Sequence, residues 1–227
     1  MSQAEDKRLA ALAAAEEVRD GMLVGLGTGS TAAFLIEELG RRVAAGLRIE
    51  ATATSEASEA LAAKVGIAVR PFAGIAAVDL AIDGADEIDP ALRAIKGAGG
   101  AMLREKVVAA SARRMVVIAD GSKRVDQLGA APLPVEVLPF AHQFVAARLR
   151  ALGAEPVLRK AETDPYLTDQ GNLVLDCRFS GLPAPAGLAR DLSAIPGVLG
   201  HGLFLDEVDA VYVAQDGRVD RIERPAA

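Results

Sequence analysis

Short apolar runs alternate with helical stretches along the first half of the chain. Val24–Leu26 is predicted to be a buried strand, and the helix that follows has apolar residues at the spacing of one helix face. These residues are Phe34, Leu35, Leu39 and Val43. Leu47–Thr54 alternates apolar and polar positions as a second strand would, and Ser55–Val65 is predicted to be a second helix. Two such units in succession are typical of a parallel sheet with crossover helices.

Three further strands are predicted downstream of these units, at Ala68–Arg70, Val78–Ile82 and Met115–Ala119. The second of them runs directly into the acidic segment Asp83–Asp89. A glycine loop, Gly97–Gly100, then opens a predicted helix. The alternation of strands and helices therefore continues through Ala119.

The pattern changes near Ala131. A helix at Phe144–Leu152 and a strand at Pro156–Arg159 are followed by a hairpin, whose turn is predicted at Asp169–Asn172. We therefore predict an α/β fold with two parts: a parallel-sheet, Rossmann-like main domain with crossover helices, and a smaller α+β domain. The main domain is predicted to comprise residues 1–130 and 205–227, and the smaller domain residues 131–204.

Composition argues against a membrane protein. The apolar fraction of 51% rests on small side chains, mainly Ala, Val and Leu, and the chain has no Trp. No apolar run approaches the roughly 20 residues of a membrane-spanning helix. Acidic residues near the N-terminus, among them Glu5 and Glu16, do not fit the basic start of a signal peptide. We therefore expect a cytoplasmic protein.

The cysteine, histidine and charge content argues against metal sites and nucleic-acid binding. The single cysteine, Cys177, excludes an intrachain disulfide and a multi-cysteine metal site, and two histidines, His142 and His201, argue against a histidine-based one. The net charge of -6 argues against a nucleic-acid partner, which would need clustered Lys and Arg. We expect no metal and no cofactor.

The first candidate site is a glycine-rich turn between the first predicted strand and its helix. Backbone N–H groups and the helix dipole at such a turn attract an anion, and hydroxyl side chains add donors. Thr28, Gly29, Ser30 and Thr31 are therefore candidates for holding a phosphate group.

Two other interpretations of this turn stay open. Gly27, Gly29 and Ala32 satisfy the GxGxxA pattern of dinucleotide binding, although the second strand ends in Thr54 and Ser55 where that site needs an acid. Alternatively, the glycines serve only tight packing.

The second candidate is the acidic strand end, Asp83, Gly84, Ala85 and Asp86. Carboxyl ends of parallel strands form the ligand crevice of an open sheet, so Asp83 and Asp86 are placed to bind sugar hydroxyls. A solvated acidic turn is the alternative for these two residues, and the preferred interpretation of Glu87 and Asp89 in the same segment. A divalent metal site with oxygen ligands is a further alternative, which the nearby lysine disfavours.

The third and fourth candidate sites each contain a lysine. Lys96 precedes the loop that contains Gly97, Ala98 and Gly99, where a ligand can approach the backbone closely. Its ammonium would stabilise negative charge on a substrate oxygen. Lys123 follows the strand end at Asp120 and is a candidate phosphate ligand, with an ordinary surface lysine as the alternative.

The helix after the glycine loop carries Glu105. Leu103 and Val107 are expected to face the core, and Glu105 lies about 200° around the helix from Leu103. Periodicity alone therefore predicts an exposed Glu105.

Five motifs in order resemble those of type A ribose-5-phosphate isomerases. They are GLGTGSTA at 25–32, DGADEID at 83–89, KGAGGAMLREK at 96–106, IADGSK at 118–123 and LPVEVLP at 133–139. A weaker likeness includes TDQGN at 168–172 and IPGVLGHGLF at 195–204. Ala98 and Gly100 depart from the family's KGGGA loop, and Gly121 stands where Ala is commoner.

The resemblance implies an aldose-ketose isomerase of the non-oxidative pentose phosphate pathway, which interconverts ribose 5-phosphate and ribulose 5-phosphate through an enediolate. It implies that Glu105 is the proton acceptor, despite the exposure that periodicity predicts. It assigns substrate contacts to residues 28–31, 83–86, 96–99 and Lys123. A homodimer or homotetramer with a sugar phosphate substrate is also implied.

Three rival functions remain. A sugar-phosphate sensor would normally carry a DNA-binding module, and the segment before Leu23 is acidic overall. An NAD-dependent oxidoreductase would bind nicotinamide, which we do not expect. A coenzyme A transferase would need a covalent carboxylate, for which the sequence shows no signature.

Overall fold

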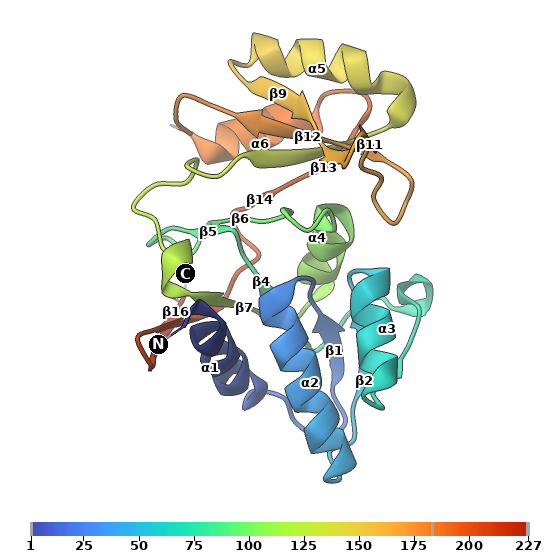
Figure 1. The fold of residues 1–227 in the computed structure, drawn as a ribbon, viewed down its shortest axis with the longest axis vertical. Coiled ribbons are helices and arrows are strands. Elements are labelled where there is room, and N and C mark those ends of the chain that lie inside the picture. The colour runs from blue at the N-terminus through green and yellow to red at the C-terminus, as the bar shows by residue number, and fades with distance from the viewer. Residues whose placement is uncertain (1, 183, 226–227) are drawn as a thin grey trace. The chain divides into compact units, whose positions relative to one another are not determined.

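The computed structural model describes residues 2–182 and 184–225, and it confirms the predicted α/β class (Figure 1). Contacts divide the chain into two compact units. Unit 1 comprises Met1–Ala85, Val107–Lys123 and Asp206–Ala227, and unit 2 comprises Asp86–Lys106 and Arg124–Leu205. No described helix is long and apolar enough to cross a membrane.

Unit 1 is built on a seven-stranded sheet with the order β16-β15-β7-β4-β1-β2-β3. The strands are β1 (Leu23–Leu26), β2 (Glu50–Ala53), β3 (Ala68–Val69), β4 (Leu80–Gly84), β7 (Met115–Asp120), β15 (Ala210–Gln215) and β16 (Arg218–Glu223). All neighbours pair in parallel except β15 and β16, which are antiparallel. The carboxyl ends of β1, β4 and β7 therefore meet at one edge of the sheet.

Three helices of unit 1 lie side by side in Figure 1, namely α1 (Gln3–Ala15), α2 (Ser30–Ala44) and α3 (Glu56–Lys64). Their apolar residues pack with Val24, Leu26 and Ile82 in one buried core. Gly25, between Val24 and Leu26 on β1, faces the other side of the sheet. A Cβ at Gly25 would lie 2.5 Å from Cγ1 of Val108, which belongs to α4 (Met102–Ser111). Residue alternation along β1 thus separates the α2 side from the α4 side.

Unit 2 contains a four-stranded antiparallel sheet with the order β13-β8-β12-β9 and a three-stranded sheet, β14-β6-β5. Its strands are β5 (Glu87–Ile88), β6 (Ala94–Ile95), β8 (Leu133–Val137), β9 (Glu155–Leu158), β10 (Lys160–Ala161), β11 (Asp164–Pro165), β12 (Leu173–Arg178), β13 (Val198–His201) and β14 (Leu203–Phe204). Helix α5 (His142–Ala151) packs on β9 and β12, and α6 (Pro185–Ser193) on β13.

The compact units do not coincide with the predicted domains, whose boundaries remain a prediction. Asp86–Lys106 groups with unit 2, whereas the sequence places it in the main domain. Its strands β5 and β6 pair with each other, and β6 pairs with β14 close to Leu205. Pairing between strands about a hundred residues apart produces no local sequence pattern from which the unit boundary could be predicted.

Candidate active site

The turn between β1 and α2 is built around two glycines. Gly29 has a φ of 105°, which favours glycine, and it precedes the first residue of α2, Ser30. A Cβ at Gly27 would lie 2.0 Å from Oδ1 of Asp83, so only glycine lets the turn approach that carboxylate. Gly29 and Ser30 are exposed, and the helix N-terminus behind them offers N–H groups and a positive dipole end. An anion can therefore bind at this turn.

Asp83 holds this turn from the end of β4. Its side chain is buried, and Oδ1 accepts hydrogen bonds from the N–H groups of Thr28 at 2.9 Å and Gly84 at 2.7 Å. The parallel pairing of β1 with β4 places both strand ends at the same edge of the sheet. In unit 1 the structure thus brings together the predicted residues 28–31 and 83–84.

Buried hydroxyl groups after β2 fix the other side of the turn. Oγ1 of Thr28 lies 2.7 Å from Oγ1 of Thr54 and donates to Oγ of Ser55 at 2.9 Å. Oγ of Ser58 donates to the carbonyl of Gly27 at 2.7 Å. The end of β2 therefore carries hydroxyls bonded to the turn, where a dinucleotide site would present an acid to the ribose.

Two lysines of unit 1 belong to this edge. Nζ of Lys7, on α1, donates to Oγ of Ser30 at 3.1 Å, a contact that the sequence analysis missed because it predicted no N-terminal helix. Lys123 ends a 3₁₀ turn directly after β7. Burial tends to raise the pKa of Asp120. Hydrogen bonds from Ser122 and Gln3 and the charge of Lys123 outweigh burial and hold this pKa below its usual range. Both lysines supply positive charge at the carboxyl ends of the strands.

In unit 2, Lys96 and Glu105 form a buried ion pair. The Lys96 side chain is 2% exposed and that of Glu105 4%, and Nζ lies 3.4 Å from Oε2. Nζ also lies 5.4 Å from the ring centroid of Phe204. Taking either charge out of water alone costs several kcal/mol, and the opposite charge at 3.4 Å offsets part of that cost. The pair combines a carboxylate and an ammonium in a dry environment.

The orientation predicted for α4 is wrong. Its buried residues are Met102, Glu105, Val108 and Ala109, whereas Val107 is 44% exposed. The helix has only ten residues, and apolar residues occur on more than one of its faces, so periodicity does not identify the buried one. Glu105 is therefore a buried carboxylate on the inner face of α4.

The glycine loop after Lys96 contacts Asp86. The N–H of Ala98 donates to Oδ2 of Asp86 at 2.9 Å. Gly97 has a φ of 106°, and a Cβ there would lie 2.9 Å from Cβ of Met102. Unit 2 thus brings Asp86, Lys96, Glu105 and the predicted loop residues 97–99 together.

The sequence suggested a solvated turn for the other two acids of the segment, Glu87 and Asp89, and this prediction is wrong. Glu87 is buried and accepts hydrogen bonds from the N–H groups of Gly129 at 2.7 Å and Ala131. Asp89 is also buried and accepts from the N–H of Arg93 at 3.0 Å. Both acids bind backbone. Within residues 2–182 and 184–225, no group of three or more His, Cys, Asp and Glu side chains is placed to hold a metal ion.

Comparison with known proteins decides the family. The model of the family "Ribose 5-phosphate isomerase A (phosphoriboisomerase A)" matches residues 50–218. The chain belongs to the ribose 5-phosphate isomerase A family. It is 55% identical over 215 residues to ribose-5-phosphate isomerase A of Sphingopyxis alaskensis, covering 95% of this chain and 94% of that protein. It is 52% identical to the protein of the same name from Methanosarcina acetivorans, over 96% and 94% of the two chains.

Solved structures of ribose-5-phosphate isomerases share the whole fold. One, a complex with phospho-erythronic acid, has a TM-score of 0.95 and 36% identity and covers 99% of this chain and 100% of its own. The ribose 5-phosphate isomerase A of Methanocaldococcus jannaschii has a TM-score of 0.93 and 37% identity, over 98% and 100% of the two chains. Family membership therefore extends over both compact units.

Further residues that the sequence analysis missed explain two of the family motifs. Glu136 of LPVEVLP is buried, and its Oε1 accepts hydrogen bonds from Oγ1 of Thr168 and Nδ2 of Asn172, each at 2.9 Å. Thr168 and Asn172 are the first and last residues of TDQGN. The two motifs thus form one buried hydrogen-bonded cluster, which no local pattern reveals.

Replacing Glu136 with Gln is expected to destabilise unit 2 less at pH 8 than at about pH 5. Burial raises the pKa of Glu136, and the hydrogen bonds from Asn172 and Thr168 only partly oppose this. A carboxyl with a raised folded-state pKa contributes stability below its unfolded pKa and loses that contribution as the pH rises through the folded value. Exchanging one acceptor for a donor costs about 1–2 kcal/mol. Urea unfolding at both pH values measures the difference between wild type and variant.

The matched control is Glu155→Gln, at an exposed position of β9. Its stability difference from wild type should not change between the two pH values. A Glu136→Gln difference that stays constant, or grows with pH, would contradict the raised pKa.

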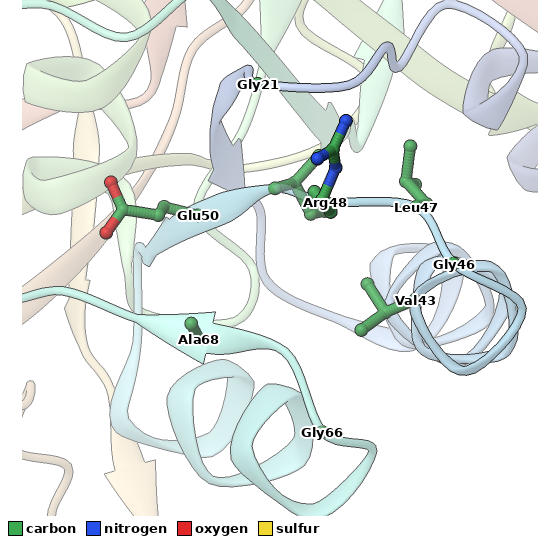
Figure 2. A pocket seen from close by; sticks show the side chains of 9 residues that line it. Gly21, Val43, Gly46, Leu47, Arg48, Glu50, Gly66 and Ala68 are labelled. Carbon is green, nitrogen blue, oxygen red and sulfur yellow. The ribbon is translucent and has the colours of Figure 1, made fainter.

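A hollow of about 580 Å³ opens at the opposite edge of the unit 1 sheet, near the start of β2. Figure 2 shows Glu50 on this strand and Arg48 just before it, with Ala68 on the neighbouring strand β3 and Gly66 in the loop before Ala68. Arg48 pairs with Asp20 at 3.0 Å. Ligands of open parallel sheets bind at the carboxyl ends of strands, whereas this hollow lies at their amino ends. We therefore place the candidate phosphate-binding site of unit 1 at the other edge.

Proposed function

We propose that Glu105 transfers the proton when this family member interconverts ribose 5-phosphate and ribulose 5-phosphate. The observation that carries the proposal is the buried pair of Glu105 and Lys96, with 3.4 Å between Oε2 and Nζ. A carboxylate shielded from water is available as a base, and an ammonium beside it can stabilise an oxyanion.

The chemistry passes through an enediolate. Glu105 removes the proton from C2 of the open-chain aldehyde, and negative charge develops on the carbonyl oxygen at C1, where Lys96 stabilises it. The same carboxyl returns the proton to C1, while a proton moves from the oxygen at C2 to the oxygen at C1. One base therefore serves both carbons without a redox cofactor.

The phosphate is held by the turn at residues 28–31, with Lys123 as a countercharge. The exposed N-terminus of α2 supports this role. Binding energy from the phosphate fixes the reacting end of the sugar. Asp83 and Asp86 handle the sugar hydroxyls, and one of them takes the hydroxyl proton when the furanose ring opens. Gly84, Ala85 and loop residues 97–99 provide the remaining substrate contacts.

A homodimer or homotetramer in the cytoplasm completes the proposal. Exposed apolar side chains of unit 2, among them Phe140 and Phe144, which are 95% and 52% exposed, support burial against another chain. Sedimentation equilibrium of the purified protein distinguishes the dimer and tetramer from a monomer.

The test of the reaction uses purified protein treated with a chelator and then desalted. With ribose 5-phosphate alone, ribulose 5-phosphate should form at rates typical of enzymes, about 1–1000 per second. Solvent deuterium should enter C1 of the product during turnover, because the base exchanges its proton with water. Activity that depends on added metal or nicotinamide would refute the cofactor-free mechanism.

A further inference from the structure

The glycine loop of unit 2 is bound by one arginine that the proposed mechanism does not use. Nη1 of Arg159, which follows β9, donates to the carbonyl of Gly97 at 3.0 Å and to that of Ala98 at 3.1 Å. Both carbonyls belong to the segment proposed to contact the substrate. One guanidinium nitrogen therefore fixes two successive peptides.

Arg159 is itself held in one position. Its Nε donates to Oδ2 of Asp176 at 2.9 Å and its Nη2 to Oδ1 at 2.5 Å, which is the bidentate geometry of a strong arginine-carboxylate pair. The side chain is 14% exposed, and the N–H of Arg159 donates to the carbonyl of Val174 on β12. The arginine is thus anchored to the four-stranded sheet.

Tyr166 contacts both Arg159 and the glycine loop. Its ring centroid lies 5.7 Å from Cζ of Arg159, and its hydroxyl donates to the carbonyl of Gly99 at 3.3 Å. A Cβ at Gly100 would lie 2.2 Å from that hydroxyl, so the loop approaches the tyrosine as closely as glycine allows. Three successive carbonyls of the loop accept hydrogen bonds from these two side chains.

These contacts set the direction of the loop N–H groups. In a trans peptide the carbonyl and the N–H point in opposite directions. The carbonyl of Gly97 faces Arg159, and the N–H of the same peptide, on Ala98, donates to Asp86 at 2.9 Å. The next carbonyl also faces Arg159, which turns the N–H of Gly99 away from the guanidinium.

We propose that Arg159 is a positioning residue for the isomerisation: through its pair with Asp176 it orients the loop peptides so that Asp86, held by the N–H of Ala98, and the N–H of Gly99 face the reacting end of the sugar. The inference rests on the proposed function and adds a residue that does not touch the substrate. Lysine cannot replace it, because a single ammonium cannot pair bidentately with Asp176 and also bind two carbonyls.

The experiment separates the reacting end of the ligand from its phosphate. Arg159→Met and Arg159→Lys are assayed for kcat and KM with ribose 5-phosphate, and for competitive inhibition by phospho-erythronic acid and by inorganic phosphate. A misplaced loop should lower kcat/KM by about 100-fold. The inhibition constant for phospho-erythronic acid should rise by about tenfold or more, while that for phosphate stays within about twofold. The matched control is Arg150→Met, on the exposed face of α5.

Thermal unfolding of each variant shows that assays are made on folded protein, and Arg159→Lys decides if Arg159→Met does not fold. An unchanged ratio of the two inhibition constants in folded protein would overturn the proposal and leave Arg159 a purely structural residue. Parallel weakening of both inhibitors would also overturn it. Failure of the proposed function is distinguishable, because wild type itself would then lack isomerase activity.

Discussion

Glu105→Gln is expected to reduce turnover of ribose 5-phosphate by at least about 1000-fold, because the amide cannot accept the proton from C2. Gln keeps nearly the shape of the buried side chain, but it removes the charge that lies 3.4 Å from Lys96 Nζ, so thermal unfolding must show that the variant is folded. The inhibition constant of inorganic phosphate should change little, since unit 1 supplies the proposed phosphate contacts. Steady-state kinetics measures turnover, and exchange of the C2 proton with deuterated solvent measures removal of that proton.

Glu155→Gln, at the exposed position of β9, is the control for the loss of one negative charge. It should retain wild-type kcat. If Glu105→Gln turned over at the wild-type rate, or exchanged the C2 proton normally, Glu105 would not be the base.

Most strands of the unit 1 sheet, and the edge that carries the candidate phosphate turn, were predictable from local patterns. The run at Val24–Leu26, the turn after it and the helix starting at Ser30 occur in succession, so one strand, one turn and one helix follow from periodicity and glycine content. The position of Asp83 beside that turn follows from the parallel pairing of β1 with β4. Parallel sheets place strand ends together, and the candidate phosphate turn could therefore be assigned before the structure was known.

Other contacts between segments distant in sequence were not predictable. Arg159 reaches the loop across about sixty residues, and Lys7 reaches Ser30 from a helix that the apolar pattern did not indicate. The buried face of α4 was also mispredicted, because a polar residue, Glu105, lies on it. Periodicity assumes that buried positions are apolar, and an ion pair in a protein interior violates that assumption. Only resemblance to the family identified Glu105 as a candidate base.

Lys96→Met is expected to lower kcat by about 100- to 1000-fold, the effect of removing one donor that stabilises an oxyanion. It is also expected to lower the free energy of unfolding by about 3–5 kcal/mol, because it removes the ammonium that lies 3.4 Å from the buried Glu105 carboxylate. Guanidinium unfolding at neutral pH measures the second effect.

The double variant Lys96→Met/Glu105→Gln separates the two effects. Removing both members of the pair also removes the cost of burying the Glu105 charge after Lys96 is lost, so the double variant should recover most of the stability that Lys96→Met alone loses. Its activity should stay as low as that of Glu105→Gln, because the base is absent. A double variant no more stable than Lys96→Met would mean that the 3.4 Å pair contributes packing and not charge compensation. Recovery of stability without activity is the expected result for a buried pair whose charges are retained for chemistry, since uncharged side chains can fill the same space.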